Sequence, residues 1–136
     1  MGFWSDLFDD KKTYDKYELG KYFLYEILGR QNYEAHPDKL STNFATVLSS
    51  CVKENCPGAH KWDLDERINY NVEKMNDTVY KLTYRGNLML IKGQYGEILK
   101  TILYFKVIVY ADKYADLKEY NGVRSTVQVF DKPPKD

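Results

Sequence analysis

The feature that most constrains the fold of this chain is residues 97–111, which read EILKTILYFKVIVYA. Apolar residues occupy both sets of alternate positions in this stretch, so it predicts a β-strand that is largely apolar on both faces. We therefore expect it to be the central strand of a sheet. The chain's own helices can cover one face, and the functional question is what contacts the other.

The two faces of this predicted strand differ in their polar residues. The odd-numbered face carries Leu99, Thr101, Leu103, Phe105, Val107, Val109 and Ala111. The even-numbered face carries Ile98, Lys100, Ile102, Tyr104, Lys106, Ile108 and Tyr110. We assign the odd-numbered face, from Leu99 through Val109, to the core. The two lysines among Ile and Tyr make the even-numbered face a candidate contact surface.

Two helices are predicted before the strands. Thr13 is the expected N-cap of a helix over residues 14–28, and Gly29 is its expected C-terminal stop. The apolar face assigned to that helix comprises Tyr17, Leu24, Ile27 and Leu28, and Tyr22, Phe23 and Tyr25 widen it. A second helix is predicted over residues 38–55, where apolar residues recur with the 3.6-residue period. Its apolar stripe comprises Leu40, Phe44, Val47, Leu48, Cys51 and Val52.

From Ile68 onward the apolar residues recur with period two, which predicts strands. The expected strands cover residues 68–73, 79–85, 88–91, 97–111 and 122–130. Asn76 and Asp77 predict a hairpin turn, Gly86 and Asn87 a bulge or second turn, and residues 93–96 another turn. Residues 112–120 are charged and are expected to form a loop or a short helical turn.

The order of elements predicts an α+β fold, in which two N-terminal helices pack on a curved antiparallel sheet of about five strands. Residues 13–130 form the single domain, residues 1–12 a short amphipathic segment and residues 131–136 a flexible tail. This order resembles the cystatin-like and nuclear-transport-factor-2-like architectures at the level of the fold alone. Because no motif accompanies the resemblance, it implies no function.

The N-terminal segment has an apolar stripe at helical spacing, formed by Phe3, Trp4, Leu7 and Phe8. We expect this stripe to dock on the domain's own sheet. A partner surface is the alternative, and membrane contact is a weaker one because acidic residues flank the stripe.

Few residues suggest catalysis or metal binding. Cys51, Cys56 and His60 are spaced C-x4-C-x3-H and with Asp63 or Asp65 would complete four zinc ligands, but structural zinc sites usually pair cysteines at tighter spacing. The acidic residues near 63–66 are expected in a solvated loop, and a Cys56–His60 nucleophile pair has no activating group in sequence. We expect no enzyme activity, no metal and no cofactor.

Single-stranded nucleic-acid binding is one alternative, because rings and cations interleave along the strands. The residues concerned are Tyr80, Tyr84, Tyr104, Lys81, Arg85, Lys100 and Lys106. In the strand over residues 79–85, however, alternation places tyrosines and cations on opposite faces, so only the even-numbered face of residues 97–111 combines them. The chain also balances 20 basic against 20 acidic residues, which does not indicate a nucleic-acid or membrane partner.

The leading hypothesis is a small non-enzymatic interaction protein that binds another protein, or its own copy as a homodimer, through a Tyr- and Ile-rich sheet face. Tyrosine, at 13 of 136 residues, suits interfaces as well as strands. The main alternative is a pocket between sheet and helices that binds a small ligand. The absence of a signal sequence predicts a cytoplasmic protein, and the Tyr-, Lys-, Asn- and Asp-rich composition suits an accessory protein of a phage or mobile element.

Overall fold

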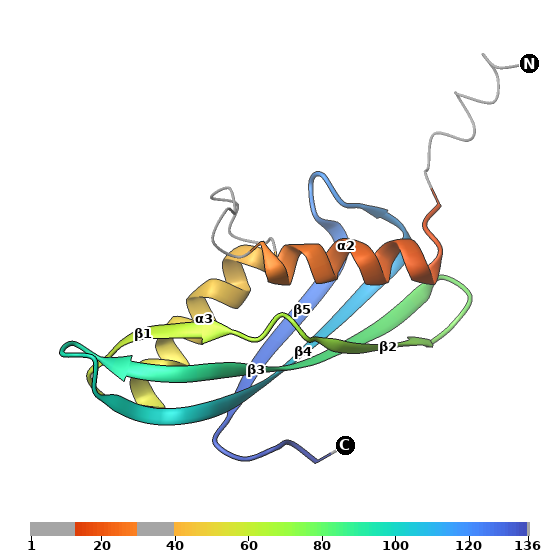
Figure 1. Cartoon of the computed structure of the whole chain (residues 1–136). Coiled ribbons are helices and arrows are strands. Elements are labelled where there is room, and N and C mark those ends of the chain that lie inside the picture. The colour runs from red at the N-terminus through yellow and green to blue at the C-terminus, as the bar shows by residue number, and fades with distance from the viewer. Residues whose placement is uncertain (1–12, 30–39, 136) are drawn as a thin grey trace, which may run out of the picture.

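A computed structural model describes residues 13–29 and 40–135 of the chain. Helices α2 (Lys16–Leu28) and α3 (Leu40–Asn55) come first. The strands follow as β1 (Ala59–Leu64), β2 (Asn69–Lys74), β3 (Val79–Gly93), β4 (Ile98–Asp116) and β5 (Asn121–Phe130). Both helices lie on the same side of one antiparallel sheet (Figure 1), so the predicted α+β class is confirmed. The N-terminal stripe of Phe3, Trp4, Leu7 and Phe8 lies outside the described residues.

The sheet is built around the long strands β3 and β4. Its order is β1, β3, β4, β5, and β2 pairs with β3 on a separate stretch. β1 pairs with residues 88–93 of β3, whereas β2 pairs with residues 80–85. β4 lies between β3 and β5, which confirms the prediction that residues 97–111 form a central strand. At 19 residues, β4 is longer than predicted, because it continues through residues 112–116.

The bulge or turn predicted at Gly86 and Asn87 does not form, because β3 runs unbroken from Val79 to Gly93. Gly86 is paired with Phe105 of β4. A Cβ atom at residue 86 would lie 2.4 Å from Cζ of the Phe105 ring. The glycine therefore makes room for an aromatic ring on the core side of the sheet.

The sequence patterns missed β1, whose residues were expected in a connection. Within β1, only Ala59, Trp62 and Leu64 pack against the core, and the other side chains are mostly exposed. The β1–β3 register also shifts twice, between Ala59 and Lys61 and between Lys61 and Asp63. These irregularities remove the strict alternation by which an edge strand is recognised in a sequence.

Helix α2 begins later than predicted, and Thr13 is not its cap. The Asp15 side chain accepts hydrogen bonds from the backbone N–H groups of Tyr17 and Glu18, at 2.9 Å and 2.8 Å. Glu18 accepts one in return from the Asp15 N–H, which completes a capping box. The predicted stop is confirmed, because the N–H of Gly29 bonds to the Tyr25 carbonyl.

The buried face of α2 coincides only in part with the predicted one. The buried residues are Leu19, Gly20, Phe23 and Ile27. Of the predicted residues, Phe23 and Ile27 are fully buried, Tyr22, Leu24 and Leu28 are half-buried, and Tyr17 is 69% exposed. The Tyr17 ring therefore contributes little to the core.

Helix α3 fits its prediction closely within the described residues. Its fully or almost fully buried side chains include Leu40, Phe44, Leu48 and Val52. The ring of Phe44 meets that of Phe105 edge to face, with centroids 5.1 Å apart. This contact places the α3 stripe against the odd-numbered face of β4, as expected.

That odd-numbered face is core over most of its length but not at its start. Leu103, Phe105, Val107, Val109 and Ala111 are fully buried. Leu99 is 39% exposed and Thr101 is also exposed, which corrects the prediction that the core begins at Leu99. The tip of the β3–β4 hairpin projects past the helices (Figure 1), so its side chains have no helix above them.

The close approach of Gly86 to Phe105 predicts the effect of one methyl group. Gly86→Ala should lower the free energy of unfolding by about 1–3 kcal/mol, because Phe44 and its neighbours hold the Phe105 ring in place. Urea denaturation measures this. In the Gly86→Ala/Phe105→Leu double variant the loss should be smaller than the sum of the two single losses. A Gly86→Ala variant as stable as the parent would show that the ring is free to move.

Candidate functional site: the open face of the sheet

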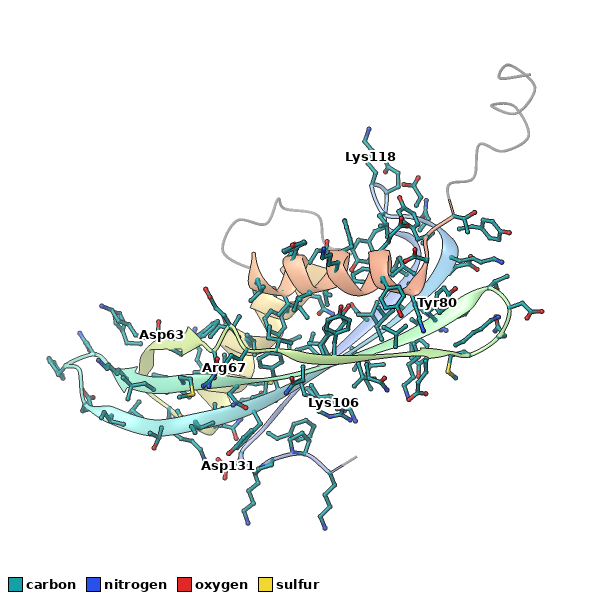
Figure 2. All side chains as sticks on the ribbon, turned by 45° about the vertical axis from the view of Figure 1, so that its right-hand side comes forward. Asp63, Arg67, Tyr80, Lys106, Lys118 and Asp131 are labelled. Carbon is teal, nitrogen blue, oxygen red and sulfur yellow. The ribbon has the colours of Figure 1, made fainter. Side chains whose placement is uncertain are left out.

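The even-numbered side chains of β4 lie on the side of the sheet away from the helices. Figure 2 shows Lys106 below the sheet on that side, with Tyr80 on the opposite side near α2. Lys100, Ile102, Tyr104, Lys106, Ile108 and Tyr110 are all half-buried. Ile98, near the hairpin tip, is 62% exposed. We call this side, as formed by β3, β4 and β5, the open face.

Strand register arranges the open face in rows that run from β3 across β4 to β5. Residues directly opposite each other on paired strands share a face. The rows are Lys81, Tyr110, Arg124; Thr83, Ile108, Thr126; Arg85, Lys106, Gln128; and Asn87, Tyr104, Phe130. Three strands thus contribute cations or rings to one surface.

This register changes the significance of the cations in β3. Tyr84 of β3 is fully buried on the helix side, so tyrosines and cations of this strand do point to opposite faces as predicted. Lys81 and Arg85, however, are paired with Tyr110 and Lys106 of β4. The cations of β3 therefore share a surface with the tyrosines of β4. The alternation of residues within one strand does not reveal which residues of the neighbouring strand lie opposite.

Contacts at the ends of the open face involve β5 and the chain that follows it. The Arg124 guanidinium lies over the Tyr110 ring, 6.0 Å from its centroid. Lys100 forms an ion pair with Asp131. Residues 131–135 leave β5 on the open side (Figure 1), and with Lys106 and Phe130 they line a hollow of about 540 Å³.

Each strand of the open face contributes at least one cation. Arg85 and Lys106 lie near the middle, and Lys81 and Arg124 lie in the row of Tyr110. Among the described residues, the carboxylates on the same side are Glu73 beside Lys81, Asp131 beside Lys100 and, toward the two ends, Asp112 and Asp63. The chain as a whole has a formal net charge of zero, so the pairing of Arg85 with Lys106 is invisible in the composition.

A second polar group lies inside the fold, where tyrosine hydroxyls gather around Glu26 of α2. The Tyr120 hydroxyl donates to Glu26 Oε2 at 3.2 Å and accepts from the Leu40 backbone N–H at 2.8 Å. The Tyr84 hydroxyl donates to the Gly20 carbonyl at 2.8 Å. These bonds tie both helices to the sheet and satisfy a backbone donor at the start of α3.

Burial and the nearby Glu26 carboxylate raise the pKa of all three tyrosines of this group. For Tyr22, whose hydroxyl donates to the Leu117 carbonyl at 3.4 Å, the pKa rises to about 12. The pKa of Tyr84 and that of Tyr120 are raised mainly by burial. Such phenols stay neutral and act as hydrogen-bond donors, which is a structural task.

The remaining candidate residues are placed as follows. Cys56 is buried at the end of α3, Cys51 is half-buried on that helix, and His60 is exposed on β1. Burial, followed by the charge of Glu54, raises the pKa of the Cys51 thiol, which disfavours the nucleophilic thiolate. Over residues 13–29 and 40–135, no three His, Cys, Asp or Glu side chains gather as a metal site would require.

Asp65, which belongs to the acidic cluster of residues 63–66, has a local partner. Its carboxylate accepts hydrogen bonds from Nε and Nη2 of Arg67 at 3.1 Å and 3.0 Å. Bonds from the Arg67 side chain and backbone hold the pKa of Asp65 below its usual range. Gly93 and Gly96 form the tight β3–β4 turn, as predicted, with the Gly96 N–H bonded to the Gly93 carbonyl.

The space between sheet and helices is occupied by side chains. Phe44, Phe105 and Tyr84 are fully buried there, with Leu48 and Leu82 beside them. The small-ligand alternative gains no support from this interior. A hollow of about 360 Å³ lined by His60, Trp62 and Lys92 lies at the surface instead.

Comparisons of the chain with protein-family models, with curated proteins and with solved structures gave no match. In the part of the chain that the structure describes, neither helix is long and apolar enough to cross a membrane. The functional argument therefore depends on the geometry of the open face.

The raised pKa of Tyr22 predicts loss of stability in alkali. An unfolded tyrosine has a pKa near 10, so the neutral form favoured by folding contributes fully below about pH 10. That contribution is lost as the pH rises from about 10 to about 12. Tyr22→Phe should therefore make the free energy of unfolding fall less steeply in this range, as measured by urea denaturation at several pH values.

The matched control is Tyr25→Phe, which removes a hydroxyl from a 63% exposed tyrosine of the same helix. This control should leave the fall of the free energy of unfolding with pH as it is in the parent. If the parent and Tyr22→Phe show the same fall, the loss of stability in alkali does not come from Tyr22.

Proposed function

We propose that this protein is a small non-enzymatic binding protein that contacts a macromolecular partner through the open face. One observation carries the proposal: α2 and α3 cover one side of the sheet, while the other side presents half-buried Ile, Tyr and Phe side chains. Apolar surface gathered in this way, with polar residues within it, is typical of interaction sites.

The charge of the open face favours a partner with a negatively charged surface. A second copy docked face to face about a twofold axis would bring the Arg85 and Lys106 region of one chain toward the same region of the other. Like charges at such a contact are unfavourable. An acidic protein surface and a nucleic acid both avoid this cost, whereas self-association through this face does not.

A non-catalytic role accords with the buried tyrosines, whose hydroxyls are used to hold the helices.

We also propose a cytoplasmic location. It is supported by the free thiols of Cys51 and Cys56, which suit a reducing compartment.

Binding to a simple polyanion tests the proposal. The protein should bind immobilised heparin at low salt, and Lys106→Glu should lower the salt concentration at which it elutes, because the change reverses a charge in the middle of the open face. The new carboxylate would lie beside Arg85, so the sheet should remain folded. The matched control is Lys21→Glu, the same charge change on the exposed side of α2.

Circular dichroism serves to check that each variant folds. If the parent does not bind, or if Lys106→Glu and Lys21→Glu elute at the same salt concentration, the open face is not the binding surface.

A further inference from the structure

The order of side chains along the open face indicates the chemistry of its partner. Arg85 and Lys106 lie side by side near its centre. Tyr104 lies two residues before Lys106 on β4, with Phe130 of β5 next to it. Tyr110 lies four residues after Lys106, between Lys81 of β3 and Arg124 of β5. Rings therefore flank a central pair of cations.

We propose that the open face binds single-stranded nucleic acid, with the backbone phosphates at Arg85 and Lys106 and the bases stacked on Tyr104 and Tyr110. This inference rests on the proposed function, since it names the partner of the same face. A sheet with helices on one side and aromatic side chains on the other is one way in which proteins bind single-stranded RNA. Stacking of bases on aromatic rings beside cations is the general mechanism for single strands.

The central cations favour nucleic acid over an acidic protein. Charged residues are depleted at the core of protein interfaces, where water is excluded. Burying Lys106 under a protein would require a matched carboxylate and would carry a desolvation cost. A phosphate backbone can contact the same cations while it remains partly in water.

The rings favour a single strand over a duplex. Tyr104 and Tyr110 are half-buried in the sheet surface, so they cannot extend far into a groove, and a base at Tyr110 would stack beside or in place of the Arg124 guanidinium that lies over the ring. Bases in a duplex are already stacked on each other, whereas those of a single strand are free to stack on side chains. The two tyrosines are six residues apart on β4, about 20 Å along a strand, so one chain of several nucleotides can reach both.

The chain after β5 extends the cationic path. Lys132 and Lys135 line the same hollow as Lys106 and Phe130. Figure 2 shows Asp131, the ion-pair partner of Lys100, on the Lys106 side of the sheet. A strand that stacks on Tyr104 and Phe130 would pass close to these lysines.

Fluorescence anisotropy with the full chain and a labelled oligothymidylate of about 16 nucleotides tests the inference. Affinity should fall steeply between about 50 mM and about 200 mM salt, and Lys106→Ala should reduce the slope of log affinity against log salt by about 0.7. Tyr104→Leu and Tyr110→Leu should each weaken binding by roughly 5- to 150-fold, while Tyr110→Phe, which keeps the ring, should bind as the parent does.

Matched controls come from the helix side. Tyr25→Leu and Lys21→Ala remove an exposed ring and an exposed cation of α2, and they should leave the affinity unchanged. Circular dichroism and melting temperature establish that every variant is folded, so that a loss of binding is not a loss of structure. Inorganic polyphosphate and a duplex of equal length serve as competitors without free bases.

The outcomes separate this inference from the proposed function. Oligothymidylate binding that is sensitive to the ring variants, with weaker competition by polyphosphate and duplex, supports a single-strand site. If heparin binding needs Lys106 but the oligonucleotide does not bind, or binds regardless of the rings, this inference is wrong and an acidic protein becomes the partner. If neither heparin nor oligonucleotide binds, both proposals fail.

Discussion

The antiparallel register between β3 and β4 determines both surfaces of the sheet. On one side it opposes Leu82 to Val109 and Tyr84 to Val107, all fully buried under the helices. On the other side the same register opposes Arg85 to Lys106. A slip of one residue would exchange the faces of a strand, burying charge and exposing the core. The burial that stabilises the fold thus also fixes the composition of the open face.

The elements with strong periodicity could be predicted from the sequence. β4, α3 and the α+β class follow from apolar residues at regular spacing. Edge strand β1 could not be found, because its bulges break the pattern, and Gly86 was misleading because the need for a glycine arises from the distant Phe105 ring. The even-numbered residues of β4 could be recognised as a surface, but the cations that adjoin them come from strands whose pairing the sequence does not reveal.

The tyrosines, which are abundant in this chain, divide into two groups with different tasks. Tyr84 and Tyr120 direct their hydroxyls to backbone or carboxylate groups of α2 and α3, so they fasten the helices to the sheet. Tyr104 and Tyr110 lie on the other side, half-buried among Ile and cations. An amphipathic ring suits both settings, since it combines a large apolar surface with a polar edge. Composition alone therefore could not separate structural tyrosines from those of the open face.

The strict alternation of β4 has a consequence for how such a protein can evolve. Residues such as Phe105 and Val107 pack in the interior, while their neighbours Tyr104 and Lys106 lie on the open face. Substitution at the second set leaves the packing between sheet and helices unchanged, so a lineage can acquire a new partner through a few replacements on the open face without losing its core. Folding and recognition are encoded on the same strand, yet selection can act on each separately.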